Sequence, residues 1–146
     1  MKDPMYLIRG KIITALNGNI TLNSANVPVT NKVRTNQSTP YVWVYSLSTD
    51  AVDDNTTKFC TDVVTRIECV TRFDGDLGGD LDSNKLANSC LNLLISKPIS
   101  GFDLSSDNFN VYTSTLEGVN YVQEEANDHT YYRAIIELSN RVEQTT

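Results

Sequence analysis

Positive charge is scarce in this sequence, and it is nowhere clustered. Twelve Lys and Arg stand against eighteen Asp and Glu in 146 residues, which gives a formal net charge of -6. Proteins that bind nucleic acid or an anionic membrane usually carry a basic patch, and this sequence shows none. No apolar run approaches the ~20 residues of a membrane helix, and Arg9 and Lys11 interrupt the stretch where a signal peptide would be apolar. We expect a protein made in the cytoplasm, with no membrane partner.

Catalytic motifs are also missing. The chain has one histidine, His129, and no GxSxG nucleophile elbow that would bring a serine to it. The glycine patterns that cradle phosphates, GxxxxGK[ST] and GxGxxG, are absent too. We therefore predict that the chain is not an enzyme and needs no cofactor. A hydrolase that uses His129 with Cys60 or Ser139 is the least favoured alternative.

Cysteine is limited to three residues, and no CxxC pair suggests a zinc site. If one strand carries both Cys60 and Cys69, the two lie about 30 Å apart, which excludes a disulfide between them. A Cys69–Cys90 pair is geometrically possible. Free buried thiols in a reducing compartment are the favoured interpretation.

Hydrophobic periodicity is the strongest signal that the sequence does contain. Apolar spacings of three and four predict two helices. One spans 4–17, with Asp3 as its N-cap and Pro4 as its first residue, and the other spans 83–97, capped by Asp82 or Ser83. Alternation predicts the main strands, which are 40–52, 58–73, 109–123 with a bulge at Gly118, and 129–142. The Asn/Thr-rich segment 19–38 is expected to hold short edge strands. Together these elements predict a single α+β domain, 1–146, with a mainly antiparallel sheet, a long hairpin and two helices packed on one face.

Two surfaces of the expected hairpin carry a pattern. In 58–73, apolar side chains alternate with charged ones of alternating sign, which suits cross-strand or inter-subunit ion pairs. The charged residues are Asp62, Arg66, Glu68 and Arg72. In 40–52, the aromatic stripe Tyr41, Trp43 and Tyr45 favours packing in the core or at a subunit interface, with a stacking platform for single strands or sugars as the alternative.

The stretch 74–82, DGDLGGDLD, resembles a calcium loop in composition but not in spacing. An EF-hand counted from Asp74 would place Gly78 and Lys85 where oxygen ligands are needed. Asp and Gly are also common turn residues. We therefore interpret 74–82 as an acidic connector and predict no metal site. A calcium- or ligand-binding β-rich module that uses this loop stays the alternative function.

The order of the motifs resembles the tail-terminator, or tail-completion, proteins of tailed bacteriophages and the related neck ring proteins. The matching stretches run through most of the chain: YLIRGKIITAL, Pro40-Tyr41-Val42, DVVTRIECVTRF, NKLANSCLNLL and YYRAIIEL. The segments 19–38 and 99–130 depart from the family pattern. They leave a terminator, a stopper and an accessory neck ring open as alternatives.

This resemblance implies a non-catalytic virion protein. Its copies would form a ring, six-fold or a multiple of it, at the head-to-tail junction or the top of the tail. The ring would join portal or neck proteins to tail-tube or tail-hub proteins, and double-stranded DNA would pass through its lumen without sequence-specific binding. We predict that the subunit interface uses the charged strand face and the acidic connector, with these residues: Asp62, Arg66, Glu68, Arg72, Asp74, Asp76 and Asp80.

Overall fold

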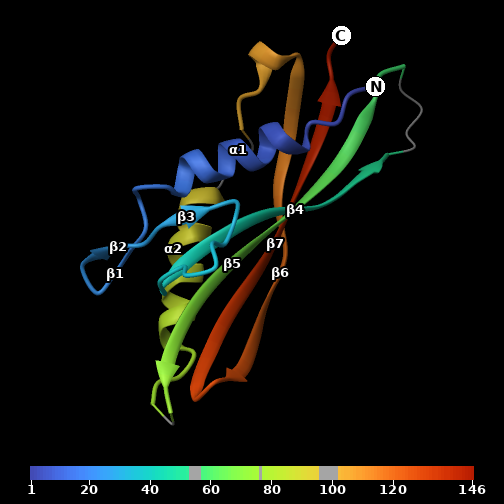
Figure 1. Ribbon diagram of the computed structural model, residues 1–146. Helices are drawn as coiled ribbons and strands as arrows, with labels where there is room; N and C mark the ends of the chain where they lie inside the picture. Colours follow the sequence, from blue (N-terminus) through green and yellow to red (C-terminus); the bar gives the residue numbers. More distant parts are fainter. Residues whose placement is uncertain (53–56, 76, 96–101) are drawn as a thin grey trace.

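The computed structural model describes residues 1–52, 57–75, 77–95 and 102–146, and Figure 1 traces the chain through them. Two helices and seven strands are described within these ranges. They follow the order α1 (Met5–Leu16), β1 (Thr21–Leu22), β2 (Ala25–Asn26), β3 (Val29–Thr30), β4 (Tyr41–Ala51), β5 (Cys60–Asp74), α2 (Leu81–Leu94), β6 (Phe109–Ala126) and β7 (His129–Gln144). A short 3-10 turn, Ser105–Asp107, precedes β6. The predicted α+β class is confirmed.

The main sheet has five strands in the order β3-β4-β5-β7-β6. Only β3 runs parallel to its neighbour, and the other three pairings are antiparallel. The predicted hairpin of β4 with β5 is confirmed, and β6 and β7 form a second, longer hairpin. Because β7 lies beside β5, the sheet brings together segments that α2 separates in the sequence (Figure 1).

Both helices contribute to one core on one face of this sheet. The predicted stripe of α1 is buried, with Ile8, Ile12 and Leu16 fully inaccessible. Its first turn is held by Asp3, whose carboxylate accepts the backbone N–H of Met5 at 2.9 Å. The sheet contributes these buried residues to the core: Val42, Val44, Val63, Ile67, Cys69, Ala134, Ile136 and Leu138. The alternating side chains between them form the opposite face, which we call the open face. No helix within the described ranges covers it.

The helix α2 begins earlier than predicted, which corrects its expected cap. The carbonyl of Asp80 accepts the backbone N–H of Asn84 at 3.0 Å, so the first helical turn already includes Asp82 and Ser83. Ser83 is fully buried, and its hydroxyl donates to the Asp80 carbonyl at 2.9 Å. The helix ends at Leu94, and the last two residues of the predicted range, 96 and 97, lie outside the described residues.

The β6–β7 hairpin is also longer than its sequence pattern indicated. The polar stretch 124–126, expected to be a connection, belongs to β6, and only Asn127 and Asp128 form the turn. Both turn residues have positive φ, 51° and 63°, as a two-residue hairpin of type I′ requires. The predicted bulge at Gly118 is confirmed by a register shift between Leu116 and Gly118. A second shift, between Val111 and Thr113, was not predicted.

Candidate assembly surface

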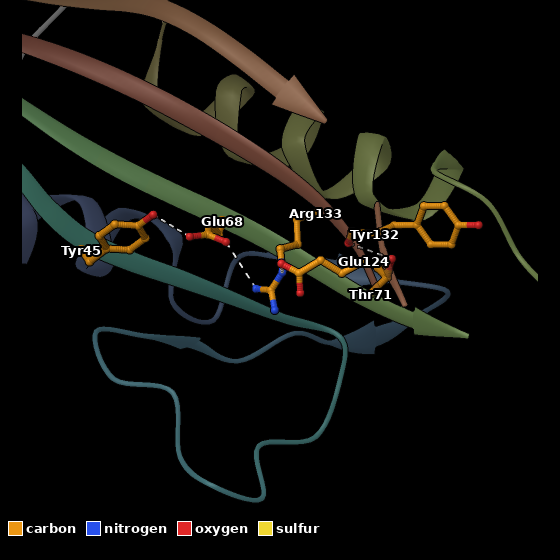
Figure 2. A network of polar contacts seen from close by, with 6 residues as sticks. All are labelled: Tyr45, Glu68, Thr71, Glu124, Tyr132 and Arg133. Atoms are coloured by element: carbon orange, nitrogen blue, oxygen red, sulfur yellow. Dashed lines mark hydrogen bonds and ion pairs between the residues drawn. The ribbon is translucent and has the colours of Figure 1, made fainter. Parts of the chain in front are cut away.

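A buried carboxylate lies at the middle of the open face. Glu68 on β5 is only 6% exposed. The hydroxyl of Tyr45 on β4 donates to its Oε2 at 2.5 Å, and Arg133 on β7 donates from Nη1 to its Oε1 at 3.3 Å. Figure 2 shows the phenol and the guanidinium reaching Glu68 from neighbouring strands. One carboxylate therefore ties the three central strands together.

The buried carboxylate of Glu68 affects the two side chains that contact it. Burial, together with the hydrogen bond to Glu68, raises the pKa of Tyr45 above its ordinary value of 10.0. Arg133 stacks over the Tyr131 ring, with its guanidinium carbon 5.8 Å from the ring centroid. Its Nε is buried without a hydrogen-bond acceptor, and Glu124 Oε1 lies 3.7 Å away. The network therefore pairs the charges of Glu68 and Arg133 but leaves one donor, the Nε–H of Arg133, without a hydrogen bond.

Two further ion pairs continue along the open face. Arg141 on β7 holds Asp62 with two hydrogen bonds of 2.9 and 3.0 Å. Arg66 lies directly opposite Glu137 in the β5–β7 register, and its Nη2 approaches Glu137 Oε1 to 2.8 Å. The hydrogen bond to Glu137 raises the pKa of Arg66. The alternating charges thus form cross-strand pairs within one chain, one of the two arrangements that the sequence indicated.

Of the charged strand residues, Arg72 is the exception. It lies opposite Tyr131 near the end of β5, its side chain is exposed, and it forms no ion pair with a carboxylate in the described part of the chain. Asp62, Arg66 and Glu68 already have partners within the chain. If they also formed a subunit interface, they would have to share those partners with the neighbouring subunit. Whether any of the four contacts such a subunit stays a prediction.

The aromatic stripe of β4 also lies on the open face, because Val42 and Val44 point into the core. The rings of Trp43 and Tyr45 pack with centroids 4.2 Å apart at a tilt of 33°. The indole N–H of Trp43 donates to the carbonyl of Asn31 at 2.9 Å. The stripe therefore belongs to the face away from the helices, where the two rings are half-buried.

The acidic connector 74–82 joins the end of β5 to α2. Asp74 pairs with the histidine on the neighbouring strand, and its Oδ1 lies 2.5 Å from His129 Nδ1. Asp80 is the residue immediately before α2, and Asp76 lies outside the described residues. Leu77 and Leu81 are 70% and 62% exposed. In the described ranges, no three His, Cys, Asp or Glu side chains gather as a metal site would require.

The hydrolase alternative is wrong on geometry. His129 opens β7 and lies opposite Asp74, whereas Cys60 lies opposite Glu143 at the other end of the sheet. Ser139 is ten residues along the same strand from His129, which corresponds to about 33 Å. Neither nucleophile can reach the imidazole.

Sequence reasoning missed the feature most relevant to assembly, which is the two open edges of the sheet. Among the described residues, β6 pairs with β7 on one side and with no strand on the other, so its 18 residues form one edge. On the other edge, β3 pairs with β4 only at Val42 and Trp43, so the rest of β4 has no strand beside it in the described part of the chain. Part of the signal was present, because β6 contains no Lys, Arg or Pro, although its three glutamates and two register shifts are features that also protect an edge.

Comparison with known proteins gives a structural likeness and no sequence family. No family model matches the chain, and no curated protein matches it significantly. Among the solved structures that match is a chain of the virion of a native gene transfer agent particle, with a TM-score of 0.63 and 15% identity. The match covers 93% of this chain and 94% of that chain. At this identity the likeness shows a shared fold. No helix of the described residues is long and apolar enough to cross a membrane.

Proposed function

We propose that this chain is a structural virion protein of a tailed phage or a phage-like particle. Copies of it form a ring at the head-to-tail junction or at the top of the tail. Two independent observations support the virion assignment. The motif order resembles tail-terminator and neck ring proteins, and the fold is shared over nearly the whole chain with a component of a gene transfer agent virion.

The observation that carries the ring itself is the pair of open edges. β6 forms one edge of the sheet, and the part of β4 from Tyr45 to Ala51 forms the other, beyond the Val44 carbonyl that accepts a hydrogen bond from the Asn31 side chain. This part of β4 contains a register shift between Ser46 and Ser48. An open edge presents unpaired backbone N–H and C=O groups to any strand of matching length. The two edges differ in sequence and lie at opposite sides of one sheet. A contact between β6 of one copy and β4 of the next is therefore heterologous, and such contacts close into rings when the rotation between copies allows it.

The most regular part of the β6 edge is its last stretch. From Gly118 to Ala126 the register with β7 continues without a shift. This stretch exposes Tyr121 and Val122, at 47% and 39%. The bulges that twist an edge away from a partner lie before Gly118, so residues 118–126 form the part of β6 best suited to pair with another copy.

The charges of the open face and the connector fit the second part of this proposal, which is that DNA passes through the ring. The open-face ion pairs neutralise one another, whereas the connector adds Asp74 and Asp80 at one end of the sheet. With a net charge of -6, a ring of these subunits would repel DNA rather than hold it. That property suits a lumen through which double-stranded DNA passes. The neighbours above and below the ring would be portal or neck proteins and tail-tube or tail-hub proteins.

Light scattering after size exclusion tests the edge contact with a matched pair of variants. Val122→Lys places a charge on the proposed pairing edge, as natural proteins do to protect such strands. Leu93→Lys places the same charge at a similar exposure on α2, away from both edges. We expect wild type and Leu93→Lys to assemble equally and Val122→Lys to stay smaller.

Each sample is measured alone and with the cognate tail-tube protein, because some ring subunits assemble only on their partner. Far-UV circular dichroism of both variants shows whether the monomer has kept its fold. Equal assembly of all three chains would contradict the role of β6. A monomer in every sample would contradict the ring.

A further inference from the structure

Two buried thiols face each other across the contact between the sheet and α2. The sulfur of Cys69, at the middle of β5, lies 3.8 Å from the sulfur of Cys90, on the inner face of α2. Both residues are fully inaccessible to solvent. The third thiol, Cys60, lies at the start of β5, about 30 Å along the strand from Cys69. The three cysteines are unbridged.

We propose that Cys69 and Cys90 form an intramolecular disulfide when the folded protein meets a two-electron oxidant, so that β5 and α2 become covalently joined. The sulfur atoms already touch, and a bond of about 2 Å requires an approach smaller than 2 Å. Rotation of the two side chains and a small shift of the helix would bring the two sulfur atoms to bonding distance. No other thiol is close enough to compete, because Cys60 lies at the far end of the strand.

The chemistry balances with a low-molecular-weight disulfide as the oxidant. One protein thiol loses its proton and attacks the reagent, which forms a mixed disulfide and releases one reagent thiol. The second protein thiol then attacks the protein sulfur of the mixed disulfide and releases a second reagent thiol. The protein loses two protons and two electrons, and the reagent gains both.

The surroundings make this reaction slow until the core opens locally. The hydrogen-bonded contact with Cys90 and the burial of the site raise the pKa of the Cys69 thiol, so little thiolate is present at neutral pH. A reducing cytoplasm keeps both thiols free. Prolonged exposure to an oxidising medium outside the cell would close the link.

The link would act on the part of the chain that contains the acidic connector. It encloses residues 70–89, which run from the end of β5 through the connector into α2. Cross-linking a loop of this length restricts the unfolded chain and stabilises the folded one. The inference does not depend on the proposed ring, because both thiols belong to one subunit.

The experiment uses the wild-type chain and oxidised glutathione under non-denaturing conditions, with time points over hours. Intact mass and thiol titration follow the reaction, and peptide mapping without reduction locates the link. We expect the loss of two of the three thiols, a single cross-linked peptide that joins the segments around Cys69 and Cys90, and a rise in melting temperature of about 5–10 °C. Reduction with dithiothreitol should reverse all three changes.

The variants separate the proposed link from other oxidations. Cys60→Ser should oxidise and gain stability like wild type, whereas Cys69→Ser and Cys90→Ser should gain nothing. If either serine variant fails to fold, the peptide map of the wild-type chain still decides. Stable glutathione adducts, a link that involves Cys60, or thiols that persist until the protein unfolds would each overturn the proposal.

Discussion

Replacing Arg133 by methionine tests whether the buried network on the open face holds the central strands together. The side chains of Glu68 and Arg133 are 8% and 19% exposed, so both charges have lost most of their water. Methionine keeps the length of the arginine stem but removes the charge. It leaves Glu68 with one neutral partner, the hydroxyl of Tyr45.

The expected cost follows from the burial. Removing one member of a buried ion pair usually costs about 3–5 kcal/mol, because the remaining charge is left uncompensated. The 3.3 Å contact and the residual exposure reduce this figure, so we expect Arg133→Met to lose about 2–4 kcal/mol of unfolding free energy. Replacing the exposed Arg141 by methionine should cost less than about 1 kcal/mol, because its pair with Asp62 is solvated.

Urea denaturation followed by far-UV circular dichroism measures both variants, and unchanged slopes show that the unfolding transition itself is unchanged. The single variant Glu68→Leu and the double variant Glu68→Leu with Arg133→Met complete the cycle. Because an apolar pair replaces a buried ion pair with little loss, the double variant should be more stable than the sum of the single effects predicts. A cost of Arg133→Met no larger than that of Arg141→Met, or simple addition of the Glu68→Leu and Arg133→Met effects, would show that the buried pair does not hold these strands together.

Three further changes probe other parts of the structure. The pKa of Tyr45 is raised in the folded protein, so the contribution of this group to stability is full below pH 10 and is lost as the pH rises through the folded pKa. Tyr45→Phe should therefore flatten the alkaline part of a curve of unfolding free energy against pH. An unchanged curve would contradict the raised pKa of Tyr45. Gly78→Ala should cost about 1–3 kcal/mol of unfolding free energy, because φ is +86° and the new methyl would lie 2.2 Å from an aromatic ring. Gly75→Ala also places a side chain at a positive φ, +58°, but the new methyl meets no atom within 4 Å, so it should cost less in the same urea titration. Arg66→Glu should weaken assembly if the charged face is an interface, and the swap with Glu137→Arg, which restores the internal pair, separates loss of a subunit contact from loss of that pair.

The local patterns of the chain predicted most of the elements. The stripe of α1 was visible because Met5, Ile8, Ile12 and Leu16 repeat at helical spacing, and all four are buried. The alternation in 58–73 predicted which side chains of β5 point to the core and which to the other face. Burial on one side is a local requirement, so it leaves a local trace in the sequence.

The order of the strands and the ends of the elements were harder to predict from the sequence. β7 inserts between β5 and β6, so the partners of Asp62 and Arg66 come from residues more than seventy positions away. A single sequence shows that a face is charged but not which strand lies beside it. The start of α2 was misplaced for a related reason, since the buried position of Ser83 depends on the tertiary contact and not on its capping propensity.

The open edge of β6 shows the same limit. Its lack of Lys, Arg and Pro could be read in the sequence, but only the strand order shows that these residues lie at an edge. The burial of Glu68 was also unpredicted, because it arises where Tyr45 and Arg133 meet it from the two neighbouring strands (Figure 2).

Electron microscopy of the assembled protein shows whether its subunits close into a ring. The purified chain is imaged alone and after mixing with its cognate tail-tube and portal proteins. We expect closed rings of uniform subunit number with an open centre, seated at the end of the tube in the mixed sample. Monomers in every sample, or open filaments in place of rings, would contradict the proposed ring.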